Sequence, residues 1–374
     1  MLWLWSYRVE VEWKKVICLK TVSQSKIPKT KTVISIIVVN ESFPSDNFDK
    51  LLNSTARIEQ KFEVILVTHS IKNGTNIESN LSLLINQSFN LVKISLILTD
   101  PDKDKGPAYR RNIGAALANS DNLLFADDDA VVAEDLSPLL KYLRIEGCAG
   151  VQPLLLKLAD NNIIDSAGDF VRKSRAGFYH PFPRAAGEKI QNLHFDLRVE
   201  EAPSMRSAFM IVRKEAFSAV GGFDETFNYN LEDVDLGWRL TTAGYKLFFV
   251  PSVKAFHKGG KTTDPAMYYD KTYKLFIINF HALQLKIAGN LFWPFIFGRF
   301  LIKSLIQEIS DVLNRGVGIV TATRDLITIY VSFLERFKQA LIHRRLLYEE
   351  FNFRGRGKLE DMAKGKRFIL SHAD

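Results

Sequence analysis

Short runs of branched apolar residues alternate with polar stretches of helical length between residues 32 and 129. The apolar runs are TVISIIVVN (32–40), FEVILVT (62–68), LVKISLILT (91–99) and NLLFADDD (122–129). A strand that is buried on both faces of a sheet has this nearly continuous apolar composition. Helix-compatible segments lie between the runs, at 48–60 and 106–120. The alternation predicts an α/β fold in which helices flank a mostly parallel sheet.

The pattern changes on both sides of this region, which predicts three parts. Residues 1–31 resemble an appendage and linker, in which VEVEW alternates like an edge strand and SQSKIPKTKT is polar. Residues 32–264 form the α/β domain. Residues 265–374 mix apolar and aromatic residues with spaced Lys and Arg, which predicts a helical, basic amphipathic extension. Such an extension lies either in a membrane interface or against the domain.

The middle of the domain is more irregular. Residues 172–189 contain several Pro and Gly residues, which predicts a long surface loop. Loops of this length are uncommon unless they cover or bind something. The following run SAFMIVRKEAF (207–217) predicts a strand that enters a helix.

Composition narrows the class of protein without identifying its partner. The chain has 374 residues, of which 47% are hydrophobic and 25% charged, as in ordinary globular proteins. Its net charge of +8 favours anionic partners such as phosphates, nucleic acid or an acidic membrane face. Two cysteines, Cys18 and Cys148, are too few for a disulfide framework or a cysteine-based zinc site.

The same composition leads to an expected location. Arg8 and Glu10 interrupt the apolar N-terminus, so we expect no signal peptide. No run of eighteen uncharged apolar residues occurs, so we expect no transmembrane helix. A cytoplasmic protein is predicted, with peripheral attachment to the inner face of the cell membrane through residues 265–374 as an open alternative.

Three aspartates end the last apolar run. Side chains alternate along an extended backbone, so Asp127 and Asp129 share a face and Asp128 points away. Two carboxylates on one side form half of a site for a divalent cation, whose other ligands are water and phosphate oxygens. Ligands of open α/β sheets bind at this end of the strands. The alternative is an acidic turn that caps a helix beginning near Glu134 or Ser137.

Two further segments carry candidate chemistry. The segment GPAYRRNIGAA opens a helix with Arg110 and Arg111 in its first turns, which suits a diphosphate or, alternatively, a solvated basic face. The segment NYNLEDVDLGWRL places Glu232 and Asp233 where a helix begins. A carboxylate near a metal–phosphate site is what a general base requires. The alternative is a capping box in which Asn230 is the N-cap and Asp233 lies three residues on.

A histidine follows a later strand. The segment VPSVKAFHKGG places His257 at a strand end before two glycines. A single histidine is more often structural than a ligand. Its position makes His257 a candidate third metal ligand beside two aspartates.

Together these segments resemble the family 2 glycosyltransferases, which have a GT-A-type nucleotide-sugar-binding fold. The resemblance runs from about Val33 to Gly260 and rests on SIIVVN, RRNIGAA, the Asp-rich strand end, VGGFDETF with EDVDLGWRL, and the late histidine. It is most similar to rhamnosyltransferase-like members that build cell-surface glycans. The resemblance implies a Rossmann-like, mostly parallel sheet and a donor that is a nucleotide-diphosphate sugar. The implied acceptor is a glycan or a lipid-linked molecule.

The resemblance also implies roles for the candidate residues. Asp127 and Asp129 would hold Mg²⁺ or Mn²⁺ on the nucleotide diphosphate, with His257 as a further ligand. Asp128 would lie at the ribose, and Arg111 near the base or ribose.

Catalysis is implied at the Glu232–Asp233 pair. Asp233 would take the proton from the acceptor hydroxyl, whose oxygen attacks the anomeric carbon in a single, inverting displacement. The metal would offset the charge of the leaving diphosphate.

One departure from the family leaves alternatives open. The family ends its second strand with an aspartate that reads the base, whereas ILVTHS places Thr68 and His69 there. Base recognition at Thr68 would therefore be looser, would use a different nucleotide, or would rely on the backbone around Asn40. A catalytically silent homologue that binds a nucleotide sugar or glycan is the main alternative. A nucleic-acid-binding protein is disfavoured because the basic residues are scattered, without an aromatic–basic repeat.

Overall fold

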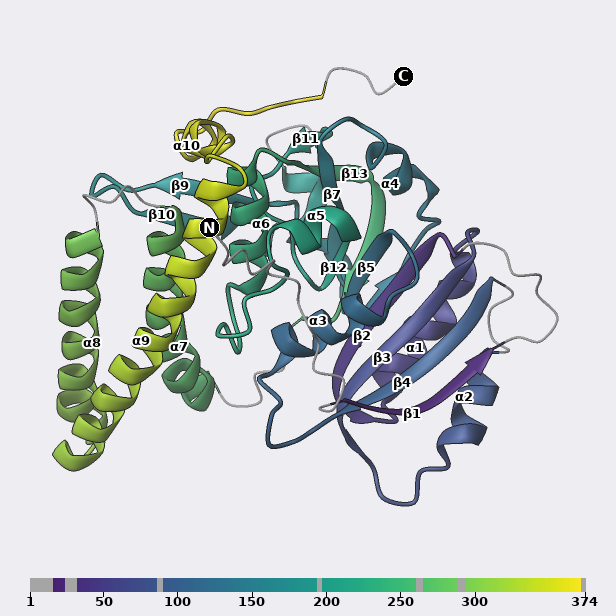
Figure 1. Cartoon of the computed structure of the whole chain (residues 1–374), viewed down its shortest axis with the longest axis horizontal. Coiled ribbons are helices and arrows are strands. Elements are labelled where there is room, and N and C mark those ends of the chain that lie inside the picture. The colour runs from purple at the N-terminus through teal and green to yellow at the C-terminus, as the bar shows by residue number, and fades with distance from the viewer. Residues whose placement is uncertain are drawn as a thin grey trace, which may run out of the picture.

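The computed structural model describes residues 16–23, 32–85, 90–193, 197–259, 265–287 and 293–370 (Figure 1). The edge strand expected at VEVEW lies outside these residues. Among the residues described, no helix is both long enough and apolar enough to cross a membrane.

One mixed sheet organises the chain. Its strands lie in the order β1 (Val16–Ser23), β4 (Leu91–Thr99), β3 (Phe62–Ile71), β2 (Ile34–Phe43), β5 (Asn122–Asp127), β12 (Phe209–Arg213), β7 (Cys148–Lys157), β13 (Lys246–His257) and β11 (Glu200–Glu201). Strands β4, β3, β2 and β5 are parallel to one another, while β12 runs antiparallel between β5 and β7. The predicted strands and the α/β class are confirmed.

Helices cover both faces of this sheet (Figure 1). One face packs against α1 (Asp46–Ser54), α2 (Ile77–Ile85) and α4 (Ser137–Tyr142). The other face packs against α3 (Pro107–Leu117), α5 (Lys214–Ala219) and α6 (Glu232–Ala243). Strand β2 needs apolar side chains on both sides for this reason: Ile36 and Val38 belong to the first core, and Ile37 and Val39 to the second.

A close helix–strand approach sets the position of α3. A Cβ atom at Gly114 would lie 2.4 Å from Ile37 Cγ2, so only glycine allows this spacing. The helix begins with Gly106 at a φ of 92° and Pro107 in its first turn, which fits the Gly-Pro start predicted from the sequence. The approach brings Arg110 and Arg111 to the strand ends.

The long loop predicted at 172–189 is wrong in part. Strands β9 (Asp169–Lys173) and β10 (Tyr179–Pro183) form an antiparallel hairpin within it. Gly177, at a φ of 85°, closes the turn by donating its N–H to the carbonyl of Ser174. Gly and Pro signalled the turn, but the short strands could not be separated from it by composition.

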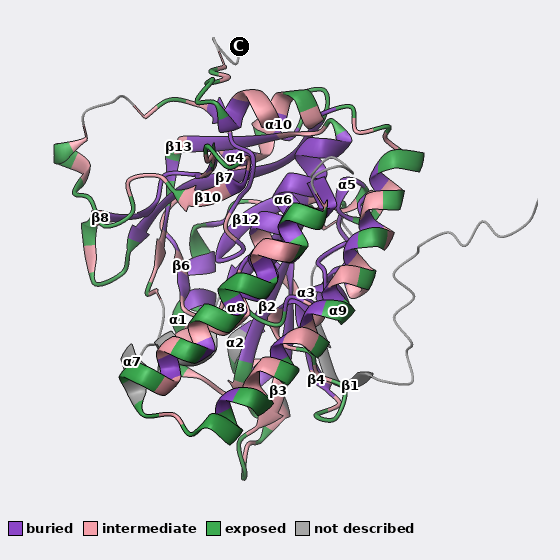
Figure 2. Cartoon of the chain, turned by 90° about the vertical axis from the view of Figure 1, so that its left-hand side faces the viewer, coloured by how far each residue is buried: buried purple, intermediate pink, exposed green. Residues whose placement is uncertain are grey.

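Four helices follow the sheet: α7 (Pro265–Ile287), α8 (Trp293–Arg315), α9 (Ile319–Glu349) and α10 (Arg356–Ala363). They share an apolar core that includes Phe280, Phe300 and Phe333, and it extends to Trp238 of α6. Figure 2 shows α8 and α9 on the side of the molecule that faces the viewer. The boundaries of the three parts expected from the sequence stay a prediction.

A buried ion cluster joins these helices to the sheet domain. Lys286 Nζ of α7 lies 2.6 Å from Asp224 Oδ2 and 2.6 Å from Asp235 Oδ1. Arg239 binds the other oxygen of Asp235 at 2.7 Å, and His343 Nδ1 of α9 lies 3.5 Å from Asp224. Burial opposes ionisation of Asp224, but Lys286 and His343 outweigh it and hold its pKa well below the usual range. The cluster therefore places opposite charges in the core, and each charged group is stabilised by the others.

Replacing Lys286 by Met should destabilise the protein strongly. The substitution leaves Asp224 and Asp235 buried with fewer cationic partners, which costs about 3–5 kcal/mol of unfolding free energy. Denaturant titration measures the loss. Lys366→Met is the matched control, because its partner Asp361 is exposed and the pair contributes less than about 1 kcal/mol. Equal losses in the two variants would contradict the role given to the buried cluster.

His343 should make stability depend on pH. Burial, together with the charges of Arg239 and Lys286, lowers the pKa of His343 from 6.5 to about 4. Between these values the unfolded chain binds the proton that the folded chain refuses, so the unfolding free energy falls as pH falls from 6.5 toward 4. Wild type should lose up to about 1.4 kcal/mol per pH unit more than His343→Gln in this window. Carboxylates such as Asp224 titrate in both proteins, so parallel curves would refute the prediction.

Candidate active site

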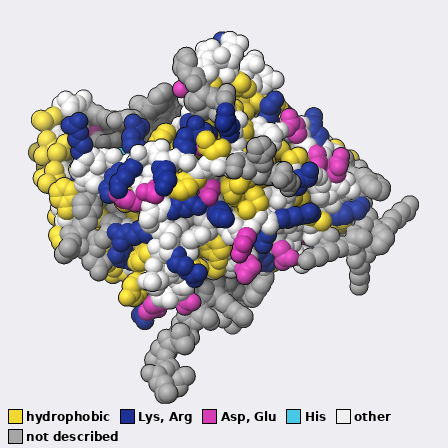
Figure 3. All heavy atoms as spheres, turned by 90° about the horizontal axis from the view of Figure 1, so that it is seen from above, with side chains coloured by type: hydrophobic (Ala, Val, Ile, Leu, Met, Phe, Trp, Pro, Cys, Tyr) yellow, Lys and Arg dark blue, Asp and Glu magenta, His cyan; other side chains and the backbone are white. Residues whose placement is uncertain are grey.

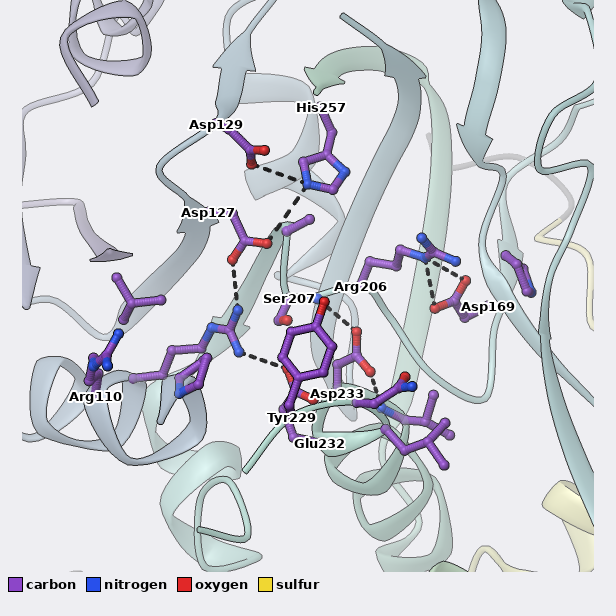
Figure 4. Close-up of a pocket in the computed structure, with 18 of the residues that line it drawn as sticks. Arg110, Asp127, Asp129, Asp169, Arg206, Ser207, Tyr229, Glu232, Asp233 and His257 are labelled. Atoms are coloured by element: carbon purple, nitrogen blue, oxygen red, sulfur yellow. Dashed lines mark hydrogen bonds and ion pairs between the residues drawn. The ribbon is translucent and has the colours of Figure 1, made fainter. Parts of the chain in front are cut away.

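A cavity of about 590 Å³ lies where β5 and β13 end and α6 begins (Figure 4). Candidates far apart in the sequence line it together: Asn40, Arg110, Arg111, Asp127, Asp128, Asp129, Glu232, Asp233 and His257. This is the sheet end at which ligands of open α/β folds bind. The site therefore draws on the parallel half of the sheet, on β13 and on α6.

Strand pairing brings the two aspartates to the histidine. Asp127 is the last residue of β5, and the chain turns at once into β6 (Ala130–Val132). Strand β6 pairs antiparallel with β13, with Ala130 opposite His257. His257 Nε2 then lies 3.3 Å from Asp129 Oδ1 and 3.8 Å from Asp127 Oδ2 (Figure 4). Asp128 and Asp129 lie in the turn between β5 and β6, so the convergence of Asp127 and Asp129 follows from this turn and from the pairing of β6 with β13, whereas the sequence analysis expected it from strand alternation.

The donor set of this cluster fits a divalent cation. One ligand atom from each of Asp127, Asp129 and His257 lies within 4.8 Å of the others. The Nδ1 atom of His257 lies 3.0 Å from Asp165 Oδ2, which leaves Nε2 toward the two aspartates. Metal-binding histidines are commonly oriented by such a carboxylate. Two carboxylates and an imidazole suit Mg²⁺ or Mn²⁺ with further oxygen ligands.

Electrostatics shows how strongly this cluster attracts positive charge. Burial disfavours the charged form of His257, but hydrogen bonds to Asp129 and Asp165 outweigh it and raise its pKa from 6.5 to about 10. The pKa of Asp165 is lowered: its burial acts against this, but the hydrogen bond to His257 prevails. Two carboxylates face one another here, so a cation between them relieves their repulsion.

Asp128 faces a different partner. Its Oδ2 accepts a hydrogen bond from Ser45 Oγ at 3.1 Å, and Ser45 also caps the first turn of α1. The alternative that the aspartates cap the following helix is wrong, because α4 begins after Leu136 without a side-chain cap. Asp128 still lines the cavity beside Asn40.

The two arginines of α3 are buried, so a solvated basic face is excluded. Arg111 donates to Asp127 Oδ1 at 2.7 Å and to Glu232 Oε1 at 2.9 Å (Figure 4). Arg110 donates to Asp104 Oδ2 and to Glu41 Oε1, each at 2.7 Å. Arg111 therefore links the metal-site candidates to the start of α6.

The start of α6 is not a capping box, contrary to the alternative considered above. Leu231 is the N-cap residue at a φ of 71°, with no side-chain cap, and Asn230 precedes it at a φ of 76°. Asp233 accepts instead from the backbone N–H groups of Ser207 at 3.3 Å and Val234 at 2.7 Å. Two consecutive left-handed residues turn the chain so that Glu232 and Asp233 reach the cavity.

Both carboxyl groups hold protons more tightly than usual. Burial, and then the neighbouring Asp233 charge, raise the pKa of Glu232 to about 7, against the effect of Arg111. Burial, and then Asp169, raise the pKa of Asp233, against the effect of Arg206. Carboxyls perturbed in this way in a cavity are candidates for proton transfer.

Helix α7 supports the left-handed turn at Asn230 and Leu231 through hydrogen bonds. Asn279 Nδ2 donates to the carbonyls of Tyr229 at 3.0 Å and Asn230 at 2.8 Å. Arg336 Nε of α9 donates to Asn279 Oδ1 at 2.7 Å, which fixes the orientation of the amide. The turn that presents Asp233 is therefore built partly by helices outside the sheet.

Sequence reasoning did not identify the opposite wall of the cavity. Asp169 and Arg206 form an ion pair there, with Arg206 Nε 3.3 Å from each carboxylate oxygen (Figure 4). Phe182, Tyr229 and Phe276 add aromatic surface. No motif marks these residues, which are single side chains on separate elements.

Thr68 is not brought to the cavity. It is fully buried in β3, and its hydroxyl donates to the carbonyl of Ser70 at 3.0 Å. Asn40 does line the cavity, and its carbonyl accepts a hydrogen bond from Arg110. Of the two sites considered for base recognition, only Asn40 is positioned to contact a ligand in this cavity.

Comparison with known sequences relates this chain to one protein family. A family model described as glycosyltransferase-like family 2 matches residues 33–283. A 78-residue segment, 20% of the chain, is 40% identical to 25% of N-acetylglucosaminyl-diphospho-decaprenol L-rhamnosyltransferase from Mycobacterium tuberculosis (strain ATCC 25618 / H37Rv). A 164-residue segment, 41% of the chain, is 32% identical to 30% of pre-mycofactocin glycosyltransferase from the same strain. The matched segments thus span between a quarter and a third of these relatives.

Comparison with solved structures concerns the fold alone. The crystal structure of GalNAc-T7 with UDP, GalNAc and Mn²⁺ superimposes with a TM-score of 0.51 at 15% sequence identity. The match covers 69% of this chain and 48% of that one. The predicted GT-A-type fold is confirmed by this likeness.

Replacing Asn279 by Leu should destabilise the turn at Tyr229–Leu231. The substitution removes the partner of two backbone carbonyls and of the buried Arg336. Unsatisfied buried groups of this kind cost about 1–3 kcal/mol each, more for a charged one. Denaturant unfolding should show a loss of at least about 2 kcal/mol. Asn53→Leu, at an exposed position of α1, is the matched control and should change little; equal effects would refute the bracing role.

Proposed function

Since this chain belongs to the glycosyltransferase-like family 2, we propose that it is a metal-dependent, inverting glycosyltransferase. It moves a sugar from a nucleotide-diphosphate donor to a hydroxyl group of a glycan or lipid-linked acceptor. The observation that carries the proposal is the convergence of Asp127, Asp129, His257 and Asp233 on one cavity. A cation site and a raised-pKa carboxyl are the two parts that such a transfer needs.

The donor diphosphate binds at the Asp127–Asp129–His257 cluster in this proposal. These three residues would hold Mg²⁺ or Mn²⁺, which supplies positive charge to the leaving diphosphate when it is bound. Arg111, held between Asp127 and Glu232, adds a fixed guanidinium at the same wall. Asp128 and Asn40 lie beside it and contact the ribose and base.

The names of similar proteins agree with this donor and acceptor class. The structure of GalNAc-T7 contains UDP and Mn²⁺. The name of one curated relative describes an acceptor in which a sugar diphosphate is joined to decaprenol. These are properties of those proteins, and we extend only their class to this chain.

Asp233 acts as general base in the proposed reaction. Its carboxylate takes the proton of the acceptor hydroxyl while that oxygen attacks the anomeric carbon. The bond from that carbon to the diphosphate oxygen breaks, and its electron pair leaves with the diphosphate. A buried carboxylate whose pKa is raised, as for Asp233, is a stronger base than an exposed one. Glu232 stays paired with Arg111 and helps to position it.

The acceptor lies against the wall opposite the donor. Asp169 and Arg206 offer hydrogen bonds there, and the rings of Phe182, Tyr229 and Phe276 offer apolar contact. Combined polar and aromatic surface suits a sugar or an amphipathic molecule. The extension at 265–374 contributes Phe276 to this wall, and we propose that it also contacts an anionic membrane surface.

Substitution of the two key aspartates tests the proposal. Asp129→Asn and Asp233→Asn should each reduce sugar transfer by at least about a hundredfold, because they remove a cation ligand and a proton acceptor. A purified sample is assayed for release of nucleoside diphosphate from a panel of nucleotide sugars, with Mn²⁺ and after chelation.

The control is Asp102→Asn, in an exposed turn, which should keep full activity. Unfolding curves establish that all variants are folded. Full transfer by both site variants would refute the mechanism. A wild-type chain that binds a nucleotide sugar but turns none over would favour the silent homologue, for which the buried position of Thr68 is the motivating observation.

A further inference from the structure

Helix α8 is oriented with its acids inward and most of its large apolar residues outward. Its two acidic residues, Glu308 and Asp311, are buried. Lys274 of α7 lies between them, 3.2 Å from Glu308 Oε1 and 3.7 Å from Asp311 Oδ2. Asp325 of α9 completes the cluster at 2.9 Å from Lys274 Nζ. A surface helix in a globular protein normally has the opposite arrangement.

Exposed residues recur along the outward side of α8 (Figure 2), and most of the exposed residues described there are large and apolar. We define the α8 face as its exposed large apolar residues, which are Phe295, Phe297, Leu301, Ile302, Leu305, Ile306, Ile309 and Leu313. Individual exposures are high, with Ile302 at 61% and Leu313 at 76%. The strip extends for about 27 Å along the helix axis at the α-helical rise. A continuous exposed apolar surface of this size marks a contact with a protein or a membrane.

The strip continues onto the start of α9. Ile319 and Val320 are 74% and 84% exposed. Between the two helices lies a second cavity of about 290 Å³, lined mainly by apolar residues that include Leu305, Leu313 and Leu326. The residues that line this cavity add an apolar groove beside the α8 face. A groove of this kind accepts a flexible hydrocarbon chain as readily as a side chain.

Charge favours a lipid bilayer over a second copy of the chain. The exposed charged residue described on α8 is Lys303. Helix α9 exposes three cations and two acids, so the exposed charges described on the two helices are net positive: Arg324, Lys338, Arg345, Glu335 and Glu349. Figure 3 shows the face seen from above, on which Lys and Arg side chains are more frequent than the Asp and Glu side chains between them. Two chains that each carry a net charge of +8 repel one another. An anionic headgroup layer instead attracts them while the apolar strip enters the acyl boundary.

A row of aromatic rings connects the α8 face to the candidate active site. Phe276 lines the active-site cavity, and its ring centroid lies 5.8 Å from that of Phe280. The ring centroids of Phe280 and Phe178 are 6.2 Å apart. Phe178 is 5.6 Å from Phe295 at the start of the α8 face. Arg299 lies over the Phe178 ring at 4.3 Å. Phe178 and Phe280 are buried, so the row is a packed contact inside the protein that joins the α8 face to the wall of the cavity.

We propose that the α8 face docks the protein on a lipid bilayer with anionic headgroups, with α8 lying along the interface. The inward acids keep α8 attached to α7 and α9, so only its outer side enters the lipid. The aromatic row packs the α8 face against α7, whose Phe276 lines the cavity. An acceptor held in that bilayer by a hydrocarbon chain would therefore be close to the element that carries the acceptor wall, a consequence that rests on the proposed function.

Vesicle flotation of the full chain tests the docking. Wild type should float with vesicles of phosphatidylcholine and phosphatidylglycerol, and less with phosphatidylcholine alone. The triple variant Ile302→Gln/Ile306→Gln/Leu313→Gln should bind at least about tenfold more weakly, because it removes apolar area from the contact. Lys303→Gln should weaken binding to the anionic vesicles by about fivefold.

A matched pair of single substitutions controls for the general effect of removing an exposed apolar residue. Ile302→Gln should weaken binding, whereas Leu83→Gln on α2, at a similar exposure of 65%, should not. Failure of wild type to float with anionic vesicles would overturn the proposal. So would equal binding by the triple variant, or a wild-type dimer in sedimentation that the triple variant dissociates.

Different experimental results would refute the docking and the proposed function. Donor turnover with a water-soluble acceptor should be unchanged in the α8 variants, while Asp233→Asn should lose turnover and keep vesicle binding. Loss of docking with intact turnover would leave the enzyme assignment standing. Intact docking with full activity of Asp233→Asn would refute only the mechanism.

Discussion

The buried ammonium group of Lys286 is the contact on which the candidate active site depends most. It lies between Asp224 and Asp235, which stand at the two ends of the segment that carries Glu232 and Asp233. A buried charge with two charged partners allows little movement, because separating any pair leaves an unpaired ion in an apolar core. Both ends of this segment are thereby fixed to α7. The position of the proposed base is a property of the helical region as much as of the sheet.

Two other polar residues of α7 act in the same direction. Asn279 holds the carbonyls before Leu231, and Gln284 pairs with both backbone groups of Tyr179 in the β10 strand. A left-handed conformation costs an ordinary residue about 1–2 kcal/mol. The turn at Asn230 and Leu231 is therefore kept only because its carbonyls have partners. This strained turn directs the carboxyl groups of Glu232 and Asp233 into the cavity. In a capping box, by contrast, the side chains would bind the backbone at the start of their own helix.

Local pattern was enough to predict the strands, the α3 start and the meeting of Asp127, Asp129 and His257. Continuous apolar runs report burial on both faces, and strand ends of one sheet gather at one edge. The capping-box alternative is wrong because it rested on the spacing of Asn230 and Asp233 alone. The backbone there is held by Asn279 of α7, which lies 49 residues later in the chain. Asp169 and Arg206 were not found for a similar reason: each is a single side chain whose partner depends on the tertiary fold.

Helix α8 shows a further limit of pattern reading. An amphipathic sequence has two sides, and periodicity does not say which side faces the protein. Here Lys274, on the same helix as Lys286, draws Glu308 and Asp311 inward. Ile309, which lies between those acids, and the neighbouring Leu305 and Leu313 then point outward. Two cations of α7 thus orient two different surfaces: the buried Lys286 fixes the segment that carries Glu232 and Asp233, and the partly buried Lys274 turns the apolar side of α8 toward the surroundings. Removing the acids from the exterior also removes the negative charge that would repel an anionic partner.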